Sequence, residues 1–233
     1  MKNRSFFLGI AGNIGAGKTL LTRELSRRTN WHAYYEPVID NPYLDDFYAD
    51  MDRWSFHLQI FFLSKRFQAQ KKMLESNISF IQDRTIYEDA EVFAKTLNRL
   101  GHLCDRDYAN YKALFDTMLE FIRPPDLIIF LKAKPESLME RIRNRGRESE
   151  KTITLDYLKI LDEAYEEWFQ RANRMTTLHI LDTDRVNLLE EKQKVDEIAK
   201  FITSHNSYCL ETLTSYEDVP CTGSGQDSCD NKA

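Results

Sequence analysis

Short runs of apolar residues alternate along this chain with longer stretches in which apolar side chains recur every three or four positions. The short runs predict buried strands, and the longer stretches predict amphipathic helices. The expected strands cover residues 5–10, 32–38, 78–84, 126–133 and 177–183. The expected helices cover residues 19–29, 53–75, 89–100, 106–122, 135–145 and 155–173, with a last helix ending near residue 204. This alternation predicts an α/β fold in which helices cover both faces of a five-stranded parallel sheet.

The composition changes at Asn206. From there the chain is rich in Ser, Thr, Gly, Asp and Cys, which cannot bury much apolar surface. We therefore expect one folded domain over residues 1–205, followed by a flexible polar tail over residues 206–233.

One loop holds four of the chain's eight glycines, within the stretch GIAGNIGAGKT at residues 9–19. The spacing Gly12-x₄-Gly17-Lys18-Thr19 fits a phosphate-binding P-loop, in which backbone N–H groups surround phosphates, the lysine reaches the β- and γ-oxygens and the hydroxyl holds Mg²⁺. A predicted strand precedes the loop and a predicted helix follows it, so the helix N-terminus would point at the anion. The residues expected to bind ATP are Gly12, Asn13, Ile14, Gly15, Ala16, Gly17, Lys18 and Thr19.

Composition and charge narrow the class of protein. The chain has 233 residues, 42% of them apolar, which is enough for a substantial core. A net charge of −5 disfavours a general binder of nucleic acid, and no apolar run reaches the roughly 18 residues that span a membrane. The four cysteines lack the spacing of metal ligands, so a reducing cytoplasm is the expected location.

Two acidic residues stand at the ends of predicted strands. Glu36 closes HAYYE and precedes Pro37, and Asp83 closes ISFIQ and precedes Arg84. Either acid alone could be a surface charge. In a parallel sheet, however, the carboxyl ends of the strands share one edge, where ligands bind, so two acids beside a phosphate loop favour a functional site.

Two further polar clusters have open interpretations. Gln59 and Arg66 lie on nearly the same face of a predicted helix, two turns apart in an apolar stripe, and are either buried groups with partners or a recognition surface. Arg141 and Arg145 share a helical face, Gly146 ends that helix and Arg147 follows. These arginines are either a solvated basic helix end or a cationic lid.

Four motifs in order resemble the deoxynucleoside kinase family, which includes deoxycytidine, deoxyguanosine and bacterial deoxyadenosine kinases. They are the P-loop, EPV at residues 36–38, DRT at residues 83–85 and RIRNRGRESE at residues 141–150, and the resemblance runs from about residue 5 to 205. The family more often has serine where Thr85 stands, and the stretch DNPYLDDFY resembles its bacterial purine-type members. The resemblance implies a P-loop NTPase fold with an arginine-rich lid, ATP and Mg²⁺ as cofactors, and a homodimer.

The resemblance also implies roles in phosphoryl transfer. Glu36 would be the general base that accepts the proton of the 5′-hydroxyl, Asp83 would hold Mg²⁺ together with Thr19, and Arg84 would orient the nucleophile. Lys18 and the lid arginines Arg141, Arg145 and Arg147 would surround ATP. In-line positioning, a metal ion and cations around the transferred group are what this chemistry requires.

The substrate site implied by the resemblance uses a separate group of side chains. Gln59 would read the base, with Arg66 and Asp89 as a charged pair facing it and Phe93 packing on it. Tyr48 and Glu150 would contact the sugar 3′-hydroxyl. Because an Asp89 carboxylate accepts from an amino group, we expect deoxyadenosine, deoxycytidine or deoxyguanosine to be phosphorylated well ahead of thymidine, with deoxyadenosine first.

Two other functions remain open from the sequence. A nucleoside monophosphate kinase shares the P-loop and the arginine lid, but its anionic acceptor would be repelled by Glu36. A nucleotide-dependent switch would hydrolyse ATP slowly and would leave Gln59, Arg66 and Asp89 without a role.

Overall fold

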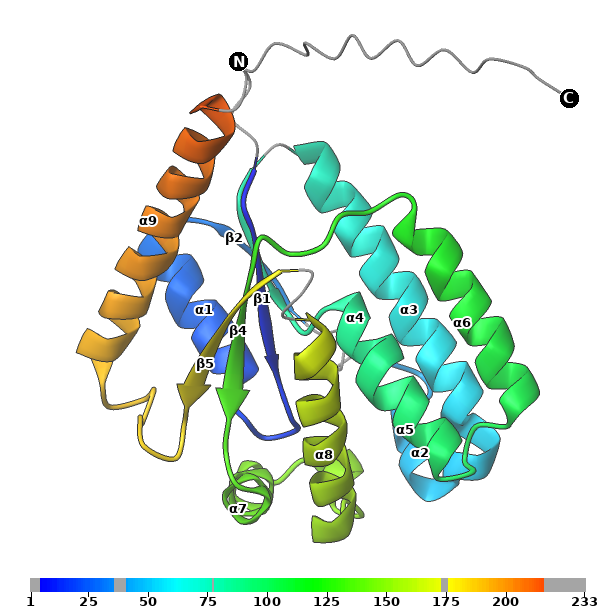
Figure 1. Cartoon of the computed structure of the whole chain (residues 1–233). Coiled ribbons are helices and arrows are strands. Elements are labelled where there is room, and N and C mark those ends of the chain that lie inside the picture. The colour runs from blue at the N-terminus through cyan, green and yellow to red at the C-terminus, as the bar shows by residue number, and fades with distance from the viewer. Residues whose placement is uncertain (1–4, 36–40, 77, 173–175, 216–233) are drawn as a thin grey trace, which may run out of the picture.

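The computed structural model describes residues 5–35, 41–76, 78–172 and 176–215, with side chains described as far as Ser204. Its strands form one parallel sheet in the order β2-β3-β1-β4-β5 (Figure 1). The bounds are β1 Phe7–Gly12, β2 His32–Tyr34, β3 Phe80–Asp83, β4 Leu127–Lys132 and β5 Thr177–Asp182. The predicted five-stranded parallel sheet is therefore confirmed.

The helices follow the predicted alternation. Their bounds are α1 Lys18–Thr29, α2 Leu44–Ala49, α3 Met51–Ser76, α4 Ile86–Glu88, η1 Asp89–Ala94, α5 Lys95–Arg99, α6 Asp105–Leu119, α7 Pro135–Arg145, η2 Glu148–Glu150, α8 Leu155–Ala172 and α9 Lys192–Ser215. Helices α1 and α9 pack together on one side of the sheet, and α3, α6 and α8 lie on the other side with α4 and α5 (Figure 1). Helices thus cover both faces, as the sequence predicts.

Helix α2 and the short turn η2 were not predicted, and two predicted helices have different bounds. The expected helix over residues 89–100 begins at Ile86 and contains a π-helical turn, η1, before it continues as α5. Helix α9 runs to Ser215, so the prediction that the last helix ends near residue 204 is wrong. The division into a domain over residues 1–205 and a polar tail over residues 206–233 stays a prediction. Residues 206–215 contain neither Gly nor Pro, so nothing in them breaks a helix, whereas Pro220 and Gly223 come later. Residues 216–233 lie outside the described part of the chain.

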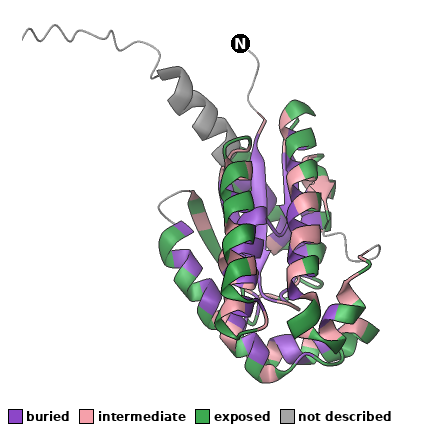
Figure 2. Ribbon diagram, turned by 90° about the vertical axis from the view of Figure 1, so that its right-hand side faces the viewer, coloured by how far each residue is buried: buried purple, intermediate pink, exposed green. Residues whose placement is uncertain are grey.

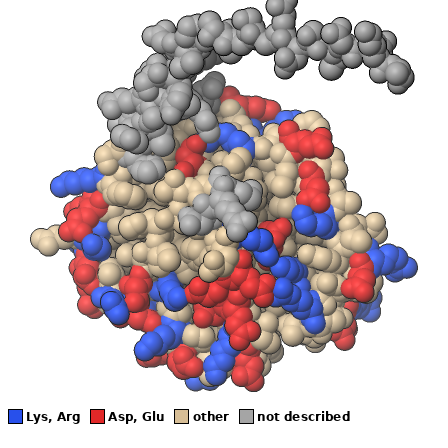
Figure 3. Space-filling view, in the orientation of Figure 1, with Lys and Arg blue, Asp and Glu red and all other residues tan. Residues whose placement is uncertain are grey.

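The core lies between the sheet and its helices. Strands β1 and β3 are buried along their whole length, and the helices bury the faces that they turn toward the sheet (Figure 2). A fully apolar central strand is typical of a parallel sheet covered on both sides. The outer surface in Figure 3 carries acidic and basic side chains interspersed with one another. No described helix is both long enough and apolar enough to cross a lipid bilayer.

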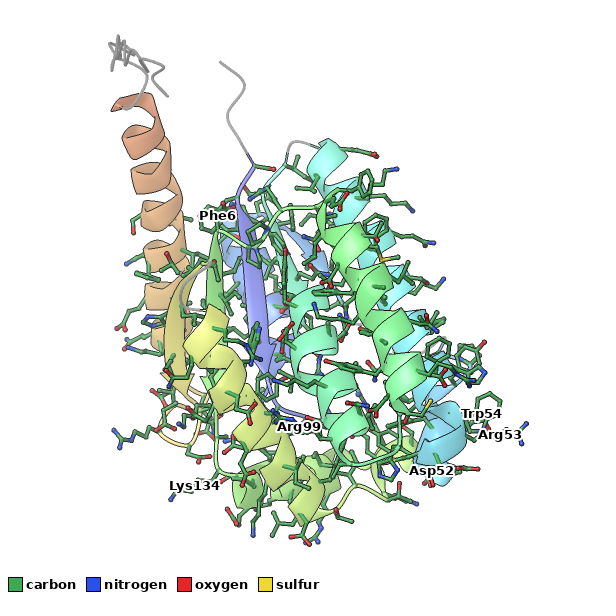
Figure 4. All side chains as sticks on the ribbon, turned by 45° about the vertical axis from the view of Figure 1, so that its right-hand side comes forward. Phe6, Asp52, Arg53, Trp54, Arg99 and Lys134 are labelled. Atoms are coloured by element: carbon green, nitrogen blue, oxygen red, sulfur yellow. The ribbon has the colours of Figure 1, made fainter. Side chains whose placement is uncertain are left out.

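The sheet has a distinct carboxyl edge, at which the strands end. Figure 4 places Phe6, just before β1, near the upper end of the molecule, and Lys134, just after β4, at the lower end. Asp52, Arg53 and Trp54 of the first turn of α3 also lie toward the lower end. The ends of β1, β3 and β4 and the beginning of α3 therefore all lie toward the lower end of the molecule.

Candidate active site

A cavity of about 760 Å³ lies at the carboxyl edge of the sheet. This volume falls within the range of small-molecule sites, roughly 300–1,000 Å³. Many of the predicted site residues line it. They come from the loop after β1, the start of α1, the end of β3 and the turn after it, helices α2, α3 and α7, and the turns η1 and η2. They are Ile14, Gly15, Gly17, Lys18, Thr19, Tyr48, Gln59, Asp83, Arg84, Asp89, Phe93, Arg141, Arg145, Arg147 and Glu150.

Five predicted site residues are absent from this lining. Gly12, Asn13 and Ala16 are buried in the P-loop itself, and Arg66 is buried on α3. Glu36 lies outside the described residues, so its position stays a prediction. It follows β2 in the sequence by two residues, and Tyr34 of β2 pairs with Gln82, the neighbour of Asp83.

The P-loop begins at a residue that must be glycine. Gly12 has φ +148°, and a Cβ there would lie 2.9 Å from the backbone oxygen of Leu131 on β4. The Lys18 Nζ donates to the carbonyls of Gly12 and Asn13, each at 2.9 Å. The lysine therefore folds back over its own loop, at the wall of the cavity.

Thr19 and Asp83 place two side-chain oxygens, which are possible metal ligands, next to each other. The Thr19 Oγ1 lies 2.5 Å from the Asp83 Oδ2, and both residues line the cavity. Magnesium prefers hard oxygen ligands and is usually held by one or two protein oxygens together with phosphate oxygens and water. Within the described ranges, no group of three or more His, Cys, Asp or Glu could hold a metal ion. The two oxygens are of the kind that magnesium prefers, and magnesium binding at Thr19 and Asp83 stays a prediction.

Arg84 occupies a strained turn immediately after β3. Its φ of 63° is left-handed, which costs a non-glycine residue about 1–3 kcal/mol. The Arg66 Nη1 donates to the carbonyls of Asp83 at 3.2 Å and Arg84 at 2.9 Å, which holds this turn from behind. The Arg84 guanidinium lies over the ring of Phe93, 4.1 Å from its centroid. The turn thereby presents Asp83 and Arg84 together to the cavity.

Arg66 and Gln59, both on α3, differ in whether their side chains have hydrogen-bond partners. The Arg66 Nε donates to the Asp89 Oδ2 of η1, and both side chains are almost fully buried. Gln59 is also buried, but its Oε1 has no hydrogen-bond partner among the described residues and it lines the cavity. A buried amide oxygen without a partner is costly unless a ligand or water supplies the donor. Arg66 is thus the buried group with partners, and Gln59 is the group available for recognition.

The arginine-rich segment lines one side of the cavity, where two of its arginines contact the carboxylate of Glu150. The Glu150 Oε2 accepts from Arg145 at 2.5 and 3.0 Å, and its Oε1 accepts from Arg147 at 3.3 Å. Glu150 is buried, whereas the two arginine side chains are partly exposed. Arg141 donates instead to the Oγ1 and the backbone oxygen of Thr183, at 2.8 and 2.7 Å, in the loop after β5. Closure of this segment over a nucleotide remains a prediction.

Several contributors to the site were not predicted. Leu58 lines the cavity beside Gln59 on α3, so the helical periodicity could have indicated it. Tyr157 of α8 also lines it, with burial raising the pKa of its hydroxyl, but no motif marks this residue. Glu88 is fully buried behind the P-loop. The spacing Thr85-x-x-Glu88, which is typical of a helix N-terminus, was the available signal for Glu88.

Comparison with known proteins decides the family. The family model described as deoxynucleoside kinase matches residues 8–207. The chain belongs to the deoxynucleoside kinase family. Its five-stranded sheet has the P-loop NTPase fold of that family, and as a member it is a phosphotransferase that phosphorylates deoxynucleosides. The comparisons do not favour the monophosphate kinase or the nucleotide-dependent switch.

Individual relatives agree with this assignment. A Dictyostelium discoideum deoxyadenosine kinase is 48% identical over 167 residues, which cover 72% of this chain and 68% of that protein. A Bacillus subtilis deoxyadenosine/deoxycytidine kinase is 37% identical over 203 residues, 86% of this chain and 93% of that protein. Among solved structures, a deoxyadenosine kinase from M. mycoides with dCMP and dCDP bound superimposes with a TM-score of 0.76 at 27% identity, covering 85% of this chain and all of that one.

Proposed function

We propose that this deoxynucleoside kinase transfers the γ-phosphoryl group of ATP to the 5′-hydroxyl of its substrate, and that deoxyadenosine is the preferred substrate. The observation that carries the proposal is the cavity, which joins the P-loop to the buried side chains of Gln59 and Asp89. One end thus offers N–H groups and cations to phosphates, and the other offers hydrogen-bonding groups to a base.

The phosphate end would bind the donor through the P-loop. Lys18 would exchange its two backbone acceptors for phosphate oxygens, which carry more negative charge. Thr19 and Asp83 would hold Mg²⁺, which offsets charge on the phosphates when it is bound. Arg84, already positioned by the turn that Arg66 supports, would add a cation next to the transferred group.

The acceptor end would activate the 5′-hydroxyl. By the resemblance, Glu36 takes the hydroxyl proton as the phosphoryl group is transferred. Tyr48, which lines the cavity from α2, and Glu150 would contact the 3′-hydroxyl. Glu150 also binds Arg145 and Arg147, so the sugar and the lid arginines would share one carboxylate.

The base would be selected by Gln59 and Asp89. The Asp89 carboxylate, oriented by Arg66, would accept from the amino group of adenine or cytosine, and the Gln59 amide would meet the neighbouring ring edge. Phe93 would pack on the base. The two relatives with 48% and 37% identity are named for deoxyadenosine or for deoxyadenosine and deoxycytidine, which supports an amino-bearing base. A B. subtilis deoxyguanosine kinase is 31% identical, so guanine is the competing purine.

The proposal includes a homodimer, as the resemblance implies. Large apolar side chains exposed on α6 and just after it, Leu114 and Phe121, would be candidates for burial between subunits. Light scattering of the purified chain gives the mass in solution directly.

Acceptor chemistry tests this function. The protein is incubated with Mg²⁺ and ATP labelled in the γ-phosphate, with deoxyadenosine in one reaction and deoxyadenosine monophosphate in another. We expect label in the 5′-monophosphate of deoxyadenosine, no label transfer to the monophosphate, and loss of transfer when Mg²⁺ is chelated. Transfer to the monophosphate alone would indicate a monophosphate kinase. Slow release of labelled phosphate that is indifferent to deoxynucleosides would indicate a switch.

A further inference from the structure

A buried carboxylate connects the P-loop to the turn that follows β3. Glu88 is fully buried, and its Oε2 accepts from the backbone N–H of Gly12 at 3.2 Å. Its Oε1 accepts from the backbone N–H of Thr85 at 3.0 Å. A buried carboxylate is tolerated where hydrogen bonds compensate for lost hydration. Glu88 thus fixes the first P-loop glycine relative to the segment that carries Asp83 and Arg84.

Tyr165 of α8 completes this group. Its hydroxyl lies 2.9 Å from the Glu88 Oε2 and 2.7 Å from the carbonyl oxygen of Gly12, in a fully buried position. A hydroxyl has one proton, so it donates to one of these two acceptors at a time. Gly12 therefore contacts Glu88 through its N–H and Tyr165 through its carbonyl oxygen.

Besides Tyr165, the Gly12 carbonyl has two donors: the Lys18 Nζ and, at the long distance of 3.5 Å, the Arg84 Nη2. In this structure the Lys18 Nζ donates to it at 2.9 Å. If Lys18 moves to the phosphates of ATP, as the proposed function requires, this buried carbonyl loses that bond. The Tyr165 hydroxyl can then donate to the Gly12 carbonyl instead of to Glu88. The Glu88 carboxylate still accepts from the backbone N–H groups of Gly12 and Thr85.

We propose that Glu88 and Tyr165 are positioning residues for ATP, which keep Gly12 in place and supply its carbonyl with a donor when Lys18 leaves. Neither residue lines the cavity, so they act through the P-loop and do not contact the substrate. The proposal rests on the proposed use of ATP. It predicts that the pair affects the phosphate donor and leaves the deoxynucleoside unaffected.

The variants Tyr165→Phe and Glu88→Gln test this proposal. Phenylalanine removes the replacement donor and retains the ring. Glutamine replaces one acceptor oxygen by an NH₂ group, which in either orientation faces the N–H of Gly12 or of Thr85. We expect each variant to raise KM for ATP by about 5- to 20-fold, the effect of losing one buried hydrogen bond. KM for the deoxynucleoside stays within about twofold, since no contact to it changes.

A matched control is Tyr111→Phe. Tyr111 is also fully buried, but its hydroxyl on α6 has no hydrogen-bond partner among the described residues. This control leaves both KM values unchanged. Because Glu88 and Tyr165 act on the same glycine, the double variant raises KM for ATP by less than the product of the two single effects.

Three outcomes would overturn the proposal: an unchanged KM for ATP in Tyr165→Phe, equal increases in both KM values, or independent effects in the double variant. If Glu88→Gln does not fold, Tyr165→Phe still decides the matter. The dissociation constant of ATP, measured at equilibrium for the wild type and for Tyr165→Phe, tests the positioning role independently of which deoxynucleoside is phosphorylated. Weaker ATP binding in the variant supports the positioning role even if the preferred deoxynucleoside differs from deoxyadenosine.

Discussion

Arg66 and Asp89 form an ion pair in which both side chains are almost completely buried. The same guanidinium donates to the carbonyls of Asp83 and Arg84, so it supports the turn after β3 and orients the Asp89 carboxylate at once. Removing one member of a buried pair leaves an uncompensated charge, which typically costs about 3–5 kcal/mol. The two residues therefore have to be replaced together before their effect on the base can be measured.

The double variant Arg66→Met with Asp89→Ala tests base selection. We expect the ratio of kcat/KM for thymidine over deoxyadenosine to rise, because the carboxylate that opposes the O4 atom of thymine is gone. Overall activity falls as well, since the turn at Asp83 and Arg84 loses its support. Each single variant loses stability in thermal unfolding without gaining thymidine activity. An unchanged substrate ratio in the double variant would remove Asp89 from the base site.

The arginines of the proposed lid, Arg145 and Arg147, differ in how cleanly they can be tested. Arg147→Ala removes one contact to Glu150 at 3.3 Å, whereas Arg145→Ala removes both donors to the Glu150 Oε2. We expect Arg147→Ala to lower kcat by about 10- to 100-fold, because a cation near the transferred group stabilises the transition state most. KM for the deoxynucleoside rises in Arg145→Ala, since Glu150 is released.

The exposed Arg143 of α7 does not line the cavity, so Arg143→Ala is a matched control that leaves kcat unchanged. If Arg147→Ala weakens deoxynucleoside binding at normal kcat, these arginines belong to the acceptor site.

The side chain of Thr85 fills the space beside Gly9 and leaves no room there for a Cβ. A Cβ on Gly9 would lie 2.9 Å from the Thr85 Cγ2, a methyl group that serine lacks. Gly9→Ala should lower stability by about 1–3 kcal/mol through overpacking of the core. In a Thr85→Ser background the loss should be smaller, because the clashing methyl group is absent. Urea unfolding of the four proteins in this cycle measures the coupling, and strictly additive effects would show that Thr85 does not restrict Gly9.

The general base is tested by Glu36→Gln. Glutamine keeps the size of the side chain and its capacity for hydrogen bonds but cannot take up the proton. We expect kcat to fall by about 10²- to 10⁴-fold, while the dissociation constant of the deoxynucleoside, measured by calorimetry, changes little. Turnover near that of the wild type would place the base on another residue.

The fold was predictable because each strand is a short apolar run between helical stretches. The P-loop, Asp83 and the arginines could be placed at one edge for the same reason, since the carboxyl ends of parallel strands meet there. The π-helical turn at Asp89–Ala94 was not predictable, because its apolar spacing also fits an α-helix. The extension of α9 was missed because composition alone suggested a tail.

Partners of individual side chains were harder to predict than their location. Gln59 and Arg66 have the same helical signal, and packing against Asp89 and the turn after β3 is what separates them. Glu88 and Tyr165 are 77 positions apart and meet only because α8 packs next to η1 and the P-loop. Contacts of this kind depend on tertiary structure, and a single sequence does not contain them.

The most direct measurement is the kcat/KM of the unaltered protein for each of the four deoxynucleosides, with ATP and Mg²⁺ at saturation. The base site described above predicts the highest value for deoxyadenosine and a value for thymidine at least about tenfold lower, because thymine would leave the buried Asp89 carboxylate facing an oxygen. Thymidine phosphorylated as efficiently as deoxyadenosine would contradict this account of the base site.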